Sequence, residues 1–114
     1  MPSVAFALPL LPGKEVDDRA GLLRYTEGED RDAYFASRRA LGITREAVWH
    51  QATPNGMLAV ILIEADDLDR ALPGTSQSQE PIDVEFREFV KDVHGLDLAN
   101  EPPPEITQIV DTRF

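Results

Sequence analysis

The feature that most constrains the fold is a turn signal between two strand-like segments. Pro54, Asn55 and Gly56 separate residues 48–53 from residues 57–64. Because Asn and Gly tolerate positive φ, such a turn joins antiparallel strands into a hairpin. A helical stretch lies on each side of this hairpin, and a strand-like segment lies towards each end of the chain. The predicted order is therefore strand, helix, strand, strand, helix, strand.

The helices are predicted from apolar residues at helical spacing. The first begins near Lys14, is expected to break within residues 26–30, where a glycine interrupts an acidic run, and continues over residues 30–40. A helical turn or two is expected over residues 66–72, followed by a polar loop. The last helix covers residues 81–94, because a proline suits its first position and a glycine follows its end. The predicted buried stripes are Val16, Ala20 and Leu23 in the first helix, and Ile82, Phe86, Phe89, Val90 and Val93 in the last.

The composition of each strand predicts its place in the sheet. Residues 3–11 and 57–64 are apolar on both faces, which is typical of central strands, whereas residues 46–53 and 106–114 mix polar and apolar side chains as edge strands do. The predicted spatial order places the last strand beside the first, then the third, then the second. This is the ferredoxin-like arrangement of a single α+β domain over residues 1–114, with both helices on one face of an antiparallel sheet.

This arrangement leaves the second face of the sheet without a cover. The two central strands carry Val, Leu and Ile on that face, and soluble monomers rarely expose an apolar patch of several hundred square ångströms. The simplest cover is a second copy related by a twofold axis. Two such sheets would bury on the order of 2,000 Å² in total. The sequence thus predicts a homodimer formed through the open sheet face.

Short sequence motifs stand where the predicted elements begin or end. They are Leu10-Leu11-Pro12-Gly13-Lys14, Leu41-Gly42-Ile43, Glu46-Ala47-Val48-Trp49 and Ser78-Gln79-Glu80-Pro81-Ile82-Asp83. Through them, residues 3–98 resemble the dimeric α/β-barrel superfamily of small ferredoxin-like proteins, and an uncharacterised branch of it in particular. That superfamily includes cofactor-free and haem-degrading monooxygenases, isomerases, peroxidases and proteins without known activity. The resemblance therefore implies a fold and a dimer rather than one reaction.

Composition excludes several classes of function. A net charge of -10 disfavours nucleic acid and anionic membrane surfaces as partners. The chain has no cysteine, so disulfides, thiolate nucleophiles and zinc–thiolate sites are excluded. No apolar run approaches the length of a membrane span, and the cytoplasm is the default compartment. The acidic clusters lack neighbouring histidines and indicate solvated charge, so we expect neither a metal nor a cofactor. The asparagine of the haem-degrading members has no match in the first strand.

His50 and Arg38 are the candidate catalytic residues. If Thr53 lies opposite Met57, His50 pairs with Val60 among aliphatic side chains, where an imidazole could act as a base or bind a ligand. The alternative is an edge-strand histidine partly in water. Tyr34 and Arg38 lie one helical turn apart and could bind a carboxylate or phenolate. The alternative for this pair is an arginine at the margin of the core beside an aromatic ring.

Trp49 and Gln51 are the remaining candidate ligand-binding residues. In the same register they share the other sheet face with Ile61 and Ile63. The indole could line a pocket near the sheet edge, or it could simply belong to the core. The sequence does not choose between these interpretations.

Three hypotheses for function follow. The first is a small-molecule-binding protein whose pocket lies between sheet and helices, near Tyr34, Arg38, Trp49 or His50. The second is a cofactor-independent monooxygenase or isomerase acting on a small aromatic or polyketide-like substrate, in which His50 shuttles protons and Arg38 holds an oxyanion. The third is a structural or interaction module without a pocket.

Overall fold

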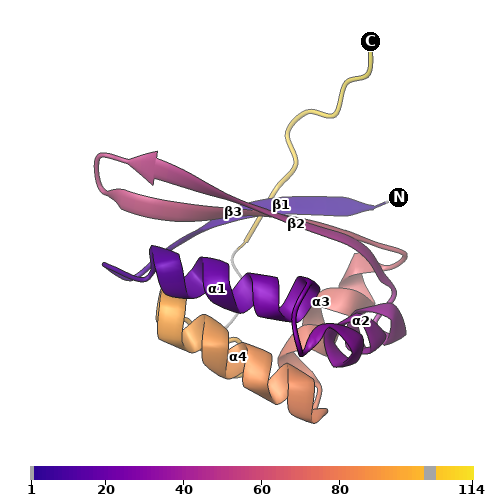
Figure 1. Ribbon diagram of the computed structural model, residues 1–114. Helices are drawn as coiled ribbons and strands as arrows, with labels where there is room; N and C mark the ends of the chain where they lie inside the picture. Colours follow the sequence, from indigo (N-terminus) through magenta and orange to yellow (C-terminus); the bar gives the residue numbers. More distant parts are fainter. Residues whose placement is uncertain (1, 102–104) are drawn as a thin grey trace.

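The computed structural model describes residues 2–101 and 105–114 of the chain. They form an α+β fold in which helices cover one face of a small antiparallel sheet (Figure 1). The elements in chain order are β1 (Ser3–Pro9), α1 (Glu15–Thr26), α2 (Arg31–Ala40), β2 (Ile43–Thr53), β3 (Gly56–Ala65), α3 (Leu68–Gln77) and α4 (Pro81–His94). Among the described residues, no helix has the length and apolar character needed to cross a bilayer.

Within the described residues the sheet has three strands in the order β1-β3-β2, with β3 antiparallel to both neighbours. The predicted hairpin and the central position of the third strand are confirmed. All the labelled helices lie on the same side of this sheet, and the other side carries no helix in Figure 1, where only the C-terminal coil extends on that side. The expected asymmetry between a covered face and an open face is therefore present.

The predicted fourth strand is wrong. Residues 105–114 form no strand, and β1 is an edge strand rather than a central one. Ile109 and Val110 are largely exposed, so this segment buries little apolar surface against the rest of the chain. Backbone ordering costs about 1–2 kcal/mol per residue, and without burial nothing offsets it.

The predicted hairpin register is also wrong, by one residue. Thr53 lies opposite Gly56, not Met57, and His50 therefore pairs with Ala59 instead of Val60. Because side chains alternate along a strand, a slip of one residue moves every β2 side chain to the other set of β3 neighbours. In the same way Glu46 pairs with Ile63, whereas the predicted register would place it opposite Glu64.

The break in the first helical stretch and the bounds of α4 are confirmed, including Gly95 in the left-handed conformation at its end. α3 is longer than predicted, because it continues through Pro73 to Gln77. The Arg87 guanidinium of α4 donates to the carbonyl oxygens of Thr75 (2.9 Å) and Ser78 (2.7 Å). This contact satisfies acceptors at the end of α3 that the local sequence leaves open.

An aromatic cluster joins α1, α2 and α4. It consists of Tyr25, Tyr34, Phe86 and Phe89, whose neighbouring ring centroids are 5.2 to 6.0 Å apart. The buried face of α1 holds Asp18, Gly21 and Tyr25 instead of the predicted stripe, and Val16 of that stripe is 78% exposed. Gly21 allows α1 to approach the Phe89 ring, since a Cβ there would lie 2.2 Å from it.

Candidate functional site

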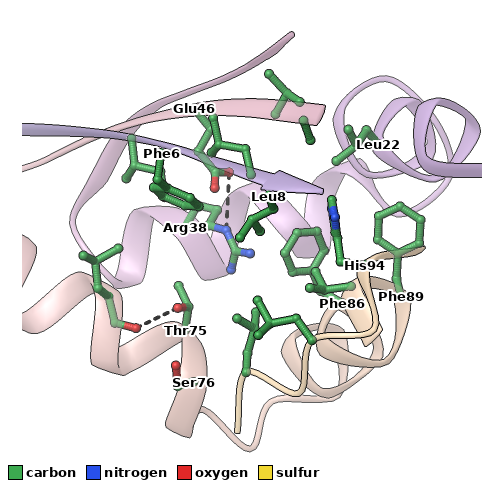
Figure 2. Close-up of a pocket in the computed structure, with 18 of the residues that line it drawn as sticks. Phe6, Leu8, Leu22, Arg38, Glu46, Thr75, Ser76, Phe86, Phe89 and His94 are labelled. Carbon is green, nitrogen blue, oxygen red and sulfur yellow. Dashed lines mark hydrogen bonds and ion pairs between the residues drawn. The ribbon is translucent and has the colours of Figure 1, made fainter. Parts of the chain in front are cut away.

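A cavity of about 680 Å³ lies between the covered face of the sheet and the helices. Its size falls within the range of small-molecule sites. Figure 2 shows side chains from strands and helices around it. The strands contribute Val4, Phe6, Leu8, Glu46, Val48, His50, Ala59, Ile61 and Ile63.

Strand alternation explains why this wall is mostly apolar. On β1, Val4, Phe6 and Leu8 turn towards the helices, while the residues between them face the open side. Leu22 of α1 and the rings of Phe86 and Phe89 of α4 close the opposite wall. Polar groups enter this space at only a few points, as in sites where apolar contact provides affinity and a few hydrogen bonds fix orientation.

Arg38 is the main polar group at one end of the cavity. Its side chain is almost fully buried, and in Figure 2 its guanidinium points into the cavity from α2. Nη1 lies 3.2 Å from Oδ1 of Asp83, and Nε lies 3.4 Å from Oε1 of Glu46. The guanidinium also stacks on the rings of Tyr34 and Phe86 at 4.3 and 4.9 Å. Burial lowers the pKa of Arg38, but Tyr34, Glu46 and Asp83 raise it by more, so the group stays charged.

Tyr34 completes this end of the cavity. Its hydroxyl donates to Oε1 of Glu46 at 2.6 Å. Burial raises the pKa of Tyr34 well above its ordinary value, and the charge of Glu46 raises it further. Tyr34 is therefore a neutral hydrogen-bond donor at physiological pH, not a phenolate base.

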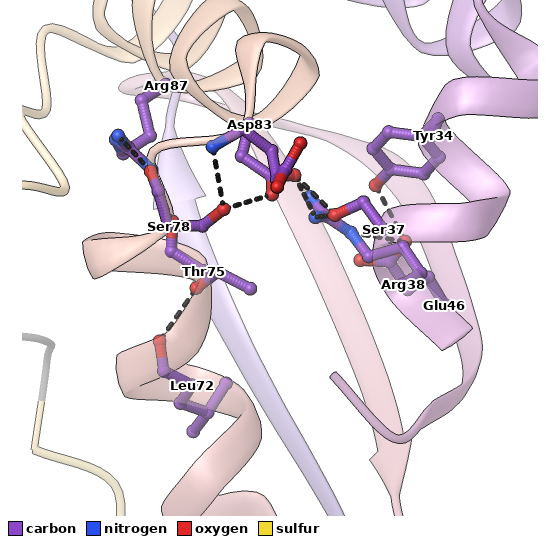
Figure 3. A network of polar contacts seen from close by, with 10 residues as sticks. Tyr34, Ser37, Arg38, Glu46, Leu72, Thr75, Ser78, Asp83 and Arg87 are labelled. Carbon is purple, nitrogen blue, oxygen red and sulfur yellow. Dashed lines mark hydrogen bonds and ion pairs between the residues drawn. The ribbon is translucent and has the colours of Figure 1, made fainter. Parts of the chain in front are cut away.

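The carboxylate of Asp83 connects Arg38 to the neighbouring helices, as Figure 3 shows. It lies in the first turn of α4 and is buried. Its Oδ1 accepts from Ser37 and Arg38 of α2, and its Oδ2 accepts from the Ser78 hydroxyl at 2.5 Å. One carboxylate thus connects α2, α4 and the segment between α3 and α4.

His50 forms a second polar site on the cavity wall. Its Nε2 lies 2.6 Å from Oδ2 of Asp18, a carboxylate of α1 that is only 2% exposed. A carboxylate can only accept, so Nε2 carries the hydrogen and Nδ1 is the ring nitrogen left for proton exchange. A buried carboxylate that orients an imidazole in this way is a recurring arrangement in general-base catalysis.

His94 lies at the end of α4 and also lines the cavity. Its Nδ1 donates to the carbonyl oxygen of Pro9 at 2.8 Å, which ties the end of α4 to the end of β1. This contact gives His94 a structural role.

The structure brings three of the five predicted site residues together. Tyr34, Arg38 and His50 line the cavity, whereas Trp49 and Gln51 lie on the open face of the sheet. Trp49 is 53% exposed, so it belongs neither to the pocket nor to the core. The physical reason is alternation, because neighbours of His50 on an edge strand must point to the opposite side of the sheet.

Sequence reasoning missed the carboxylates that orient these residues. Asp18 was not singled out, although its spacing from Gly21 and Tyr25 places all three on one helix face. The incorrect register places Glu46 opposite Glu64 and hides its contact with Arg38. Asp83 belongs to a motif that predicts only a helix start, and no local signal shows that it meets Arg38. In the part of the chain that the structure describes, no group of three or more His, Asp or Glu could hold a metal ion.

No family model matches the chain, and no curated protein or solved structure is significantly similar to it.

The raised pKa of Tyr34 predicts a loss of stability in alkali. The folded chain holds this proton more tightly than the unfolded chain, so its contribution is complete below the ordinary pKa of 10.0 and is lost as the pH rises above it. We expect the free energy of unfolding to fall by up to about 1.4 kcal/mol per pH unit for this group.

Urea titrations between pH ~9 and ~11 should show that the free energy of unfolding falls less steeply with pH for Tyr34→Phe than for the wild type. We compare the slopes of stability against pH and not the stabilities themselves, because Tyr34→Phe also loses the hydrogen bond to Glu46. Tyr25, whose pKa burial also raises, leaves a residual slope in both proteins. Equal slopes for the two proteins would contradict the claim that the raised pKa of Tyr34 causes the loss of stability in alkali.

Proposed function

We propose that this protein binds a small, mostly apolar molecule in the cavity between its sheet and its helices. The observation that carries the proposal is an apolar cavity with a buried guanidinium directed into it. A structural module without a pocket is disfavoured, because Trp49 lies on the open face and does not fill the space between the sheet and the helices. With the indole on the other face, nothing from β2 fills that space except Glu46, Val48 and His50.

The His50–Asp18 pair favours a second candidate, a cofactor-independent enzyme that begins by removing a proton from carbon. This step is the common start of an isomerase or of a monooxygenase acting on an aromatic or polyketide-like substrate. The substrate C–H bond would break, its proton would pass to Nδ1 of His50, and the electron pair would remain on the substrate. Asp18 would stabilise the imidazolium that forms. Arg38 of α2 contacts Glu46, which lies four residues from His50 along β2. We therefore assign proton transfer to His50 and ligand binding to Arg38.

We also propose the ferredoxin-like, dimeric α/β-barrel identity and a homodimer formed through the open sheet face. Trp49, Leu58, Val60 and Leu62 belong to this face by their register, and the indole is exposed in the single chain. A second copy is the simplest partner whose surface matches an open apolar sheet face. This interface would leave the cavity on the other face of the same strands.

The binding proposal predicts that filling the cavity abolishes uptake of a neutral apolar dye. Val48→Trp places an indole inside the cavity from a half-exposed position on β2, and we expect it to weaken Nile red binding at least tenfold, as read by dye fluorescence. The matched control is Gln51→Trp on the same strand, which adds the same ring to the open face. Equal loss in both variants, or no binding by the wild type, would contradict a cavity site.

The enzyme candidate predicts that His50 acts as a base on a carbon acid admitted to the cavity. Nitrobenzisoxazole is a suitable probe, because removal of its C–H proton breaks the N–O bond and releases a coloured phenolate. We expect His50→Gln to slow the protein-catalysed reaction about a hundredfold, which is the low end of general-base effects. Gln51→Ala, on the other face, should keep the wild-type rate. A rate unchanged in His50→Gln would remove His50 from the mechanism.

The dimer proposal predicts that a charge on the open face separates the copies. Trp49→Glu should reduce the sedimentation coefficient at micromolar concentration from that of a dimer to that of a monomer, because the carboxylate would be buried unpaired. Val16→Glu adds the same charge at an exposed apolar position on α1 and should leave the dimer intact. A wild-type protein that sediments as a monomer would refute the proposal directly.

A further inference from the structure

Resting on the proposed function, we infer that the ligand is an uncharged, elongated, ketone-like molecule that directs its oxygen to Arg38 and extends its apolar body towards His50. Three features of the cavity carry this inference. They are a free donor at one end, the two carboxylates that already pair with its guanidinium, and the length of the apolar wall.

The free donor is on Arg38. Nη1 of this side chain donates to Ser37 and Asp83, and the buried Nε has no hydrogen-bond partner among the described residues. No hydrogen bond from Nη2 to another described residue is present, and Figure 2 shows the guanidinium directed into the cavity. A side chain that is only 6% exposed therefore presents an N–H group to the cavity. Such a donor requires an acceptor oxygen, since an unpaired donor in an apolar site is costly.

The charges in contact with that donor disfavour a carboxylate ligand. The Arg38 guanidinium lies between two carboxylates, those of Glu46 and Asp83, so the groups in direct contact with it carry more negative charge than it carries positive charge. The buried Arg87 nearby donates to main-chain carbonyl oxygens. A third carboxylate would meet repulsion in a low-dielectric site. Arg19 and Glu101, which also line the cavity, are exposed and opposite in charge. A neutral carbonyl oxygen accepts from Nη2 without adding charge.

The length of the ligand follows from the register. Glu46 pairs with Ile63 and His50 pairs with Ala59, so the two polar points lie four residues apart on one face of the sheet. At about 3.3 Å per residue this is on the order of 13 Å. Val48 and Ile61 line the stretch between them. Tyr34, Arg38 and Glu46 also line a second hollow of about 430 Å³, so they form the wall that closes this end.

Competition against Nile red tests this inference on the full chain. The probes are methyl nonyl ketone, which is long enough to span the cavity, decanoic acid as its charged counterpart, and methyl propyl ketone as a short one. We expect the long ketone to displace the dye at least tenfold more effectively than ionised decanoic acid at neutral pH. The short ketone should be at least about a hundredfold weaker than the long one, because each methylene buries apolar surface.

Glu46→Gln tests the charge argument, since it removes one carboxylate and keeps both the shape and an acceptor for Tyr34. In this variant, the affinity of decanoic acid relative to that of the long ketone should rise at least threefold. If the acid binds as tightly as the ketone in the wild type, or if Glu46→Gln leaves their ratio unchanged, the inference is overturned while the binding proposal stands. If Nile red does not bind the wild-type protein, both are overturned.

Discussion

The burial of Arg38 is the interaction on which the rest of this structure depends. A guanidinium is taken out of water only where charged and hydrogen-bonding partners surround it, and here they come from three elements. Glu46 comes from β2, Asp83 from α4, and the rings of Tyr34 and Phe86 stack on its faces. The cluster thus fixes where α2 and α4 stand relative to the sheet. It also closes one end of the cavity with a polar wall, in which Arg38 and Tyr34 are buried.

The cavity is a consequence of how this chain divides its apolar residues. A chain of 114 residues can bury only a small hydrophobic core. Here the aromatic cluster packs α1, α2 and α4 against one another. Arg38 and the rings near it pack the helices against one another. The side chains of the strands do not fill all the volume between the sheet and these helices, and the cavity remains there. A ligand of matching shape would complete the packing that the protein alone leaves unfinished.

Sequence reasoning recovered what local patterns encode and failed where distant contacts decide. The apolar stripe of α4 and the glycine at its end predicted that helix to the residue, and Tyr34 and Arg38 were placed on one helix face that proved to line the cavity. The hairpin register could not be read, because a turn of this composition admits loops of two or three residues and a one-residue change exchanges the faces. The partners of Arg38 lie 8 and 45 positions away along the chain, beyond any periodicity.

The corrected register also separates two roles along one strand. Even-numbered residues of β2 such as Glu46, Val48 and His50 face the cavity, while Trp49 and Gln51 between them face the open side. A substitution on β2 therefore reaches either the cavity or the open face, seldom both, because the backbone of the sheet stands between them. One face of this edge strand lines the cavity and the other lies on the open side of the sheet, which explains why its composition looks mixed. The mixture predicted an edge strand, and β2 is indeed an edge strand whose residues are mostly exposed. Within it, two alternating sets of residues face the cavity side and the open side.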